Sequence, residues 1–220
     1  MGSVKERYFS SNTIDIQAAQ MLHQVSSRPR ELALIPKHSA LLVLDMQEYF
    51  LSPESHAYIP SAAAILPGLQ NLIDAFSQRN CPIFFTQHIN TPENAAMMGQ
   101  WWREIIFIEN PLSVIAPQFD TRAGVILQKP QYDAFYQTDL DDRLRRLNVS
   151  QLVICGVMTH LCCETTARSA FVRGFEIFFP VDGTATYNAV FHGATLTNLA
   201  HGFAHLCLIA DILAFFESNG

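Results

Sequence analysis

The sequence is poor in charge, since Asp, Glu, Lys and Arg make up 15% of its 220 residues, against about 25% in a typical domain. The net charge of −6 leaves no basic excess, which argues against a nucleic-acid binder or a protein that docks on anionic membranes. Apolar residues reach 49%, which excludes intrinsic disorder. So little charge indicates a large core or a surface covered in an oligomer.

Membrane and secretion signals are also missing. No stretch reaches the roughly 18 uninterrupted apolar residues of a membrane span, and the first residues lack the apolar core of a signal peptide. The five cysteines are odd in number and form no CxxC pair, which favours reduced thiols. We therefore expect a cytoplasmic protein that binds a small molecule, with no nucleic-acid and no membrane partner.

Several catalytic motifs are absent as well. The sequence has no GxSxG, no Walker loop and no GxGxxG, so it gives no support to a serine triad or a nucleotide site. Its eight histidines show neither HExxH nor tight Cys/His spacing, so no zinc site is expected. We expect no metal and no cofactor.

What the sequence does contain is an alternation of short apolar runs and helical periodicities. Wholly apolar runs are typical of parallel strands that are buried on both faces. The alternation predicts an α/β domain with three α/β/α layers and a six-stranded, mostly parallel, Rossmann-like sheet. The expected strands are 40–44, 82–86, 124–128, 151–155, 175–181 and 205–208. The expected helices are 67–79, 140–147, 160–173, 189–204 and 209–216.

Two segments do not fit this alternation. Residues 1–38 show no strand pattern, and we expect an N-terminal arm that packs on the body or on a neighbouring subunit, although a partly ordered leader fits equally well. Residues 39–220 then form the domain. Within it, residues 89–123 are rich in Pro, Asn and Gln. This segment is too long for a plain connection, which predicts a functional loop or lid.

Polar residues follow the predicted strands at their carboxyl ends, where ligands bind in open α/β sheets. The candidates from this rule are Asp45, Thr86, Gln87, His88, Lys129, the segment 156–162 and Asp182.

Three of these residues provide a thiol, an amine and a carboxylate. Cys162 lies about one turn into a predicted helix, with Thr159 as a plausible N-cap, so the helix dipole and a nearby Lys129 would both favour its thiolate. Asp45 could act as general base and acid. Backbone N–H groups of residues 156–162 could form an oxyanion hole. The alternative is a small core cysteine beside a structural Asp45–Lys129 ion pair.

The other cysteines lie in or beside apolar runs, and we interpret them as core residues. They are Cys81, Cys155, Cys163 and Cys207.

Three segments resemble the motifs of one family. Leu-Asp-Met-Gln-Glu-Tyr-Phe (44–50), Lys-Pro-Gln-Tyr-Asp-Ala-Phe (129–135) and Gly-Val-Met-Thr-His-Leu-Cys-Cys-Glu-Thr (156–165) are similar, in order and spacing, to segments of the isochorismatase-like hydrolase superfamily. The resemblance runs from about residue 38 to 214 and implies a homodimer or larger homo-oligomer.

The resemblance also implies roles for individual residues. Asp45, Lys129 and Cys162 would form a catalytic triad. The backbone N–H groups of Met158 and Cys162 would form the oxyanion hole, and the peptide bond between Val157 and Met158 would be cis.

The superfamily contains several chemistries, so the fold does not settle the function. Its cysteine members cleave C–N bonds in nicotinamide, N-carbamoyl compounds, biuret or maleamate. Isochorismatases cleave a vinyl ether and generally lack the nucleophilic cysteine. Here Cys162 occupies the nucleophile position, and His88 stands where isochorismatases show a glutamine. Their substrate-binding arginine has no evident match, with Arg103 a weak substitute.

These features favour a metal-independent cysteine hydrolase that cleaves a small amide, carbamoyl or ureido compound. The alternative is an isochorismatase in which Asp45 is the general acid, and a third hypothesis is a non-enzymatic oligomeric scaffold. The metal motif of nicotinamidases, an Asp and two His shortly after the first strand, is missing, because His56 alone lies there. Nicotinamidase activity is therefore not expected.

Aromatic residues close to these motifs indicate a pocket for a small, planar, weakly charged amide, although ordinary packing would explain each of them equally well. The expected substrate-binding residues are Phe50, His88, Trp101, Trp102, Tyr132 and Phe135.

Overall fold

In the computed structural model, which describes residues 4–25 and 33–218, seven strands form one sheet in the order β3-β2-β1-β4-β5-β7, with β6 paired to β4. All of these pairs are parallel. The strands are β1 (Ser39–Leu44), β2 (Ile83–His88), β3 (Val125–Lys129), β4 (Gln151–Val157), β5 (Glu176–Pro180), β6 (Thr184–Ala185) and β7 (His205–Cys207). The six predicted strands are present. The seventh, β6, is two residues long, too short to leave a pattern in the sequence.

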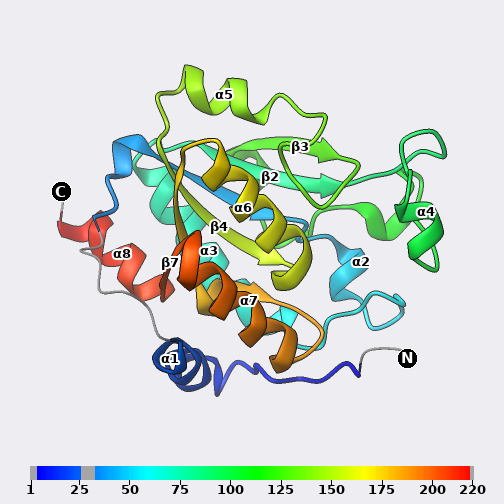
Figure 1. Ribbon diagram of the computed structural model, residues 1–220, viewed down its shortest axis with the longest axis horizontal. Helices are drawn as coiled ribbons and strands as arrows, with labels where there is room; N and C mark the ends of the chain where they lie inside the picture. Colours follow the sequence, from blue (N-terminus) through cyan, green and yellow to red (C-terminus); the bar gives the residue numbers. More distant parts are fainter. Residues whose placement is uncertain (1–3, 26–32, 219–220) are drawn as a thin grey trace.

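Helices cover both faces of the sheet, which confirms the three predicted layers. The helices are α1 (Ile14–Gln24), α2 (Glu48–Leu51), α3 (Ala62–Gln78), α4 (Met98–Trp101), α5 (Leu140–Arg146), α6 (Glu164–Val172), α7 (Ala189–Gly202) and α8 (Ile209–Ser218). Helices α3 and α8 pack together on one face, whereas α5, α6 and α7 lie on the other (Figure 1). None of the helices in the described part of the chain combines the length and apolarity needed to span a membrane.

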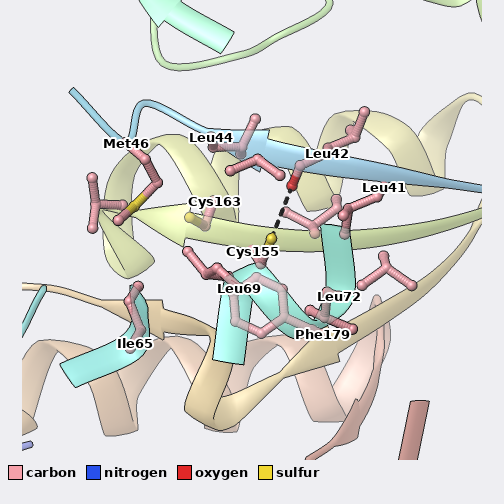
Figure 2. Close-up of a cluster of buried hydrophobic side chains, with 14 of the residues drawn as sticks. Leu41, Leu42, Leu44, Met46, Ile65, Leu69, Leu72, Cys155, Cys163 and Phe179 are labelled. Atoms are coloured by element: carbon pink, nitrogen blue, oxygen red, sulfur yellow. Dashed lines mark hydrogen bonds between the residues drawn. The ribbon is translucent and has the colours of Figure 1, made fainter. Parts of the chain in front are cut away.

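The core lies on both faces of β1 and β4, whose residues are all buried. Cys155 and Cys163 belong to this core, among leucine side chains of β1 and α3 (Figure 2). The Cys155 thiol donates to the carbonyl oxygen of Leu42 at 3.4 Å. Cys81 and Cys207 are also buried, so the four cysteines that were interpreted as packing residues do pack in the interior.

Gly156 allows β1 and β4 to approach each other closely. It pairs with Leu44, and a Cβ atom at this position would lie 2.1 Å from the Leu44 carbonyl oxygen. Its φ of +108° is also one that only glycine adopts easily. This contact places Asp45, which directly follows β1, beside the carboxyl end of β4.

The described part of the N-terminal arm packs on the body of its own chain. Tyr8 and Phe9 are buried, and the Tyr8 hydroxyl accepts a hydrogen bond from the backbone N–H of Thr186 at 2.9 Å. The backbone N–H of Glu6 donates to the carbonyl oxygen of Tyr187 at 2.8 Å. Residues 1–3 and 26–32 of the expected arm lie outside the described residues.

Candidate active site

Four side chains meet at the carboxyl edge of the sheet. Asp45 follows β1, His88 ends β2, Lys129 ends β3, and Cys162 lies five residues after β4. Strands β2 and β3 are paired so that His88 lies opposite Lys129. All four residues are buried. The three residues predicted as a triad are therefore brought together at the point where the strand order reverses, which is where such sheets bind ligands.

The Lys129 ammonium connects the members of this group. Its Nζ lies 2.8 Å from Oδ2 of Asp45 and 3.5 Å from Sγ of Cys162. It also donates to the carbonyl oxygen of Gln131 at 2.8 Å. An ammonium has three N–H donors, and these contacts hold it between the carboxylate and the thiol.

Two hydrogen bonds to Thr86 of strand β2 hold the side chain and the backbone of Asp45 in place. The Thr86 hydroxyl donates to Oδ1 of Asp45 at 2.6 Å, and the backbone N–H of Asp45 donates to the Thr86 oxygen at 3.0 Å. Asp45 also has a φ of +50°, a strained conformation for a residue with a side chain. Thr86 is thus a supporting residue that the rule of strand ends selected from the sequence.

The charges of the group follow from burial and from the Lys129 contacts. Burial by itself would raise the pKa of Asp45, but Lys129, with smaller contributions from His88 and Cys162, outweighs burial and the pKa is lowered. Burial likewise opposes the charge of Lys129, yet Asp45 and Cys162 raise its pKa. The pKa of Cys162 is raised by burial and by the Asp45 charge, which outweigh Lys129. The resting group is therefore a carboxylate, an ammonium and a neutral thiol.

This protonation state corrects one expectation from the sequence. The helix dipole and Lys129 were expected to favour the Cys162 thiolate, but the thiol is buried and shares Lys129 with Asp45. A carboxylate oxygen of Asp45 and Sγ of Cys162 lie within 4.8 Å of each other, so the carboxylate is placed to take the thiol proton at the moment of attack.

A single wide turn carries Cys162. Residues Thr159–Cys163 form a π-helical turn before α6, a feature that is often found at functional sites. Thr159 makes no capping hydrogen bond, so its predicted role as N-cap is wrong. Its hydroxyl instead lies 3.5 Å from Nδ1 of His192. The peptide bond between Val157 and Met158 is cis, as the resemblance implied.

His88 is neutral and oriented by its neighbours. Asn90 donates from Nδ2 to the carbonyl oxygen of Pro130 at 2.9 Å, so its Oδ1 faces Nε2 of His88 at 3.0 Å. Nε2 therefore carries the proton, and Nδ1 faces Nζ of Lys129 at 3.4 Å. Burial, followed by Lys129, lowers the pKa of His88 to about 4.

A cavity with about 500 Å³ of empty space, its open mouth included, lies against Cys162 and Met158. Its wall is largely aromatic and aliphatic. The remaining lining residues are Tyr49, Phe50, His56, Ala57, His88, Asn90, Met98, Trp102, Glu104, Ile105, Ile106, Tyr132, Leu161 and Tyr187. Four of the predicted pocket residues, Phe50, His88, Trp102 and Tyr132, are among them, and the Trp102 indole donates to the Tyr132 hydroxyl at 2.7 Å.

Two predicted pocket residues lie elsewhere. Trp101 is 75% exposed and does not line this cavity. Phe135 is buried, but its ring stacks on the ring of Phe175, with 6.0 Å between the centroids. The Arg173 guanidinium also lies over the Phe135 ring, 4.7 Å from its centroid. Sequence reasoning also missed the parts that Tyr49, Glu104 and Tyr187 play in the wall. No sequence signal marks Glu104, whose position depends on how the loop 89–123 folds back.

The residue types of this group are also those of a metal site, because Asp45, His88 and Cys162 offer ligand atoms within 4.8 Å of one another. The Lys129 ammonium, however, contacts all three side chains, at 2.8, 3.4 and 3.5 Å. A fixed positive charge in that place repels a metal cation. The residues present therefore fit an ammonium better than a metal ion.

Comparison with known proteins identifies the family. Residues 39–211 match the model of the Isochorismatase domain. The chain belongs to the isochorismatase family. As a hydrolase of the isochorismatase family, it is an enzyme, and the hypothesis of a non-enzymatic scaffold is not retained.

Individual relatives of this isochorismatase-family hydrolase carry different names. The chain is 39% identical to "Nicotinamidase 3" of Arabidopsis thaliana over 77% of its own length and 84% of the relative. It is 26% identical to "Enterobactin synthase component B" of Escherichia coli K12, over 87% of its length and 68% of the relative. A cysteine hydrolase from Pseudomonas syringae superposes with a TM-score of 0.81 at 25% identity, over 89% of this chain and all of that one.

The first of these relatives bears on an expectation from the sequence. Nicotinamidase activity was not expected because the metal motif of nicotinamidases is missing. The chain is nonetheless similar to a protein of that name.

Proposed function

We propose that the protein is a metal-independent cysteine amidohydrolase, which cleaves the C–N bond of a small amide, carbamoyl or ureido compound. The observation that carries this proposal is the position of Nζ of Lys129, 2.8 Å from Asp45 and 3.5 Å from the Cys162 sulfur. A nucleophile, its base and an orienting charge are thereby joined beside a cavity.

In the first half of the proposed reaction, Sγ of Cys162 attacks the substrate carbonyl carbon while Asp45 takes the thiol proton. Met158 and Cys162 line the cavity, and in the proposed reaction their backbone N–H groups donate to the oxyanion that forms. Lys129 keeps its charge and balances that of the reacting group. The C–N bond then breaks, and Asp45 returns its proton to the departing nitrogen, which leaves as ammonia or an amine.

The second half hydrolyses the thioester. Asp45, again a carboxylate, takes a proton from a water molecule that attacks the acyl carbon. The C–S bond breaks, the thiol recovers its proton, and the carboxylic acid leaves. One carboxylate thus acts twice as base and twice as acid, and the cycle ends with the carboxylate and the neutral thiol with which it began.

The comparisons support amide cleavage. A relative at 39% identity is named for nicotinamide hydrolysis, and the superposed enzyme from Pseudomonas syringae is named a cysteine hydrolase. Nicotinamide therefore belongs among the amides to be tested.

Isochorismatase activity is the second candidate, and the similarity to Enterobactin synthase component B favours it. In that reaction Asp45 would protonate the vinyl ether, and Cys162 would be dispensable. Isochorismate carries two carboxylates, however, and the described residues that line the cavity include no Lys or Arg to bind them. The charge of the cavity therefore disfavours a substrate with two carboxylates.

A substrate panel tests the proposal. Nicotinamide, benzamide, N-carbamoyl amino acids, biuret and maleamate are incubated with the wild-type protein, Cys162→Ala and Cys81→Ser, and released ammonia is measured. Cys81 is a matched control because it is a buried thiol that does not line the cavity and that donates to the carbonyl oxygen of Pro36. We expect wild type and Cys81→Ser to hydrolyse at least one amide, and Cys162→Ala to fall to background while keeping its fold. Full activity of Cys162→Ala, or pyruvate release from isochorismate alone, contradicts the proposal.

A further inference from the structure

One charged side chain stands out in the cavity wall. Among the described residues that line the cavity, Glu104 provides the one carboxylate, and none is Lys or Arg. Its side chain is 51% exposed. The proposed reaction does not use this carboxylate.

Two donors hold Glu104 in place. The Tyr49 hydroxyl donates to Oε1 at 2.7 Å, and Nδ1 of His56 lies 2.7 Å from the same oxygen. Since a carboxylate can only accept, Nδ1 of His56 carries a hydrogen. The Tyr49 hydrogen bond, with a smaller contribution from His56, lowers the pKa of Glu104, so the side chain is ionised at neutral pH.

The two oxygens of the Glu104 carboxylate differ in the hydrogen bonds that they accept. Both donors point at Oε1, and no side chain or backbone group of the described residues donates a hydrogen bond to Oε2. Tyr49 and His56 therefore fix the orientation of the group and leave an acceptor available. The nearby aromatic walls, Trp102, Tyr132 and Tyr187, also attract a positive charge through their π faces.

We infer that Glu104 is a specificity-determining residue, which accepts a hydrogen bond from an N–H group, or pairs with a cation, at the end of the substrate away from the scissile amide. The inference rests on the proposed function and narrows it. The preferred substrates are planar amides that carry a second N–H donor or a positive charge, such as ureido or aminomethyl compounds. Amides that carry a carboxylate at that end are disfavoured.

The effect of Glu104 on ligand binding must be distinguished from the effects of nearby positive side chains. Lys5 donates to the carbonyl oxygen of His56 and lies over the ring of Tyr187 at 4.5 Å, and Arg103 also lowers the pKa of Glu104. Neither lines the cavity. Glu104→Gln removes the charge while retaining an oxygen that accepts from Tyr49, so it leaves these neighbours unchanged.

The test measures binding rather than turnover. Cys162→Ala is titrated calorimetrically with 3-(aminomethyl)benzamide, a cation, and 3-carbamoylbenzoate, an anion of similar size. The same titrations are made with Glu104→Gln and, as a control, Glu109→Gln added to that background. Glu109 is an exposed residue of the same loop that does not line the cavity.

We expect the cation to bind about threefold or more tightly than the anion at low salt, as for a single half-exposed charge. Glu104→Gln should bring the ratio of the two dissociation constants close to one, and Glu109→Gln should keep it. Equal binding of both ligands, no binding of either, or a ratio that survives Glu104→Gln overturns the inference. This readout needs no hydrolysis, so failure of the amide panel and failure of the inference are distinguishable.

Discussion

The ammonium of Lys129 lies 2.8 Å from Oδ2 of Asp45, and neither side chain exposes any surface to solvent. Removal of one partner from such a pair leaves a buried charge without compensation, which is more costly than loss of both. The pair therefore links the stability of the fold to the chemistry of the site.

Lys129→Met should lower the free energy of unfolding by about 3–5 kcal/mol, because the Asp45 carboxylate would keep its burial and lose its cation. Addition of Asp45→Asn should recover a large part of that loss, since the amide carries no charge. Urea unfolding of both single variants and the double variant measures the effect. A Lys129→Met protein as stable as wild type would show that the pair is not a buried ion pair in solution.

The pH dependence of hydrolysis should lack a histidine step. Asp45 has a lowered pKa and is the active base above it, so activity falls only when the pH drops through that lowered value. His88, with a pKa near 4, stays neutral throughout. We expect kcat/KM for the best amide to be flat between about pH 6 and 8. An inflection near 6.5 that disappears in His88→Gln would assign a charge change to this imidazole.

Asp182 should affect stability in a pH-dependent way. Burial raises its pKa to about 6, so the folded state binds a proton that the unfolded chain has already lost. Stability is therefore lost as the pH rises from the unfolded value toward 6, and the loss persists above it. Asp182→Asn, whose amide oxygen can still accept from the backbone N–H of Ile209 as Oδ1 does at 2.8 Å, should be about 1–3 kcal/mol more stable than wild type at pH 7.5.

Urea unfolding at pH 4 and 7.5 measures this difference, with the exposed Asp74→Asn as control. The gain should be confined to the higher pH. An equal gain at both values would mean that the Asp182 charge is not its cause.

The Tyr8 hydroxyl should anchor the arm to the body. It accepts from the backbone N–H of Thr186 at 2.9 Å and lies 2.8 Å from Nδ1 of the buried His192. Tyr8→Phe leaves both groups buried without this partner, at a cost of about 1–3 kcal/mol. Thermal unfolding beside Tyr136→Phe, whose side chain is 48% exposed, measures the loss. An equal Tm for the two variants would indicate that the arm is not fixed to the body by this contact.

Much of the fold is predictable from the sequence because its strands are short, wholly apolar runs such as 40–44. Such runs are typical of parallel strands that are buried on both faces. The two-residue strand β6 and the π-helical turn at Thr159–Cys163 are different, because tertiary hydrogen bonds define them and no local pattern marks them.

The residues of the candidate active site are predictable from the sequence to a similar extent. Asp45, Lys129, Thr86 and Cys162 follow from the rule of strand ends, and the resemblance joins three of them in a triad. The cavity wall is not predictable in this way, since Trp101 turns outward and Phe135 packs under Arg173. Side-chain direction and the course of the loop 89–123 depend on packing partners distant in the sequence. For the same reason the sequence did not indicate Glu104.

In the proposed reaction, Cys162 forms a thioester with the acyl group of its substrate. The most direct measurement is intact and peptide mass spectrometry of the enzyme, quenched with acid during turnover of the best amide from the panel. We expect a mass increase equal to the acyl group, located on the peptide that contains Cys162 and removed by neutral hydroxylamine. Turnover at full rate without any adduct, and with Cys162→Ala still active, would contradict the account.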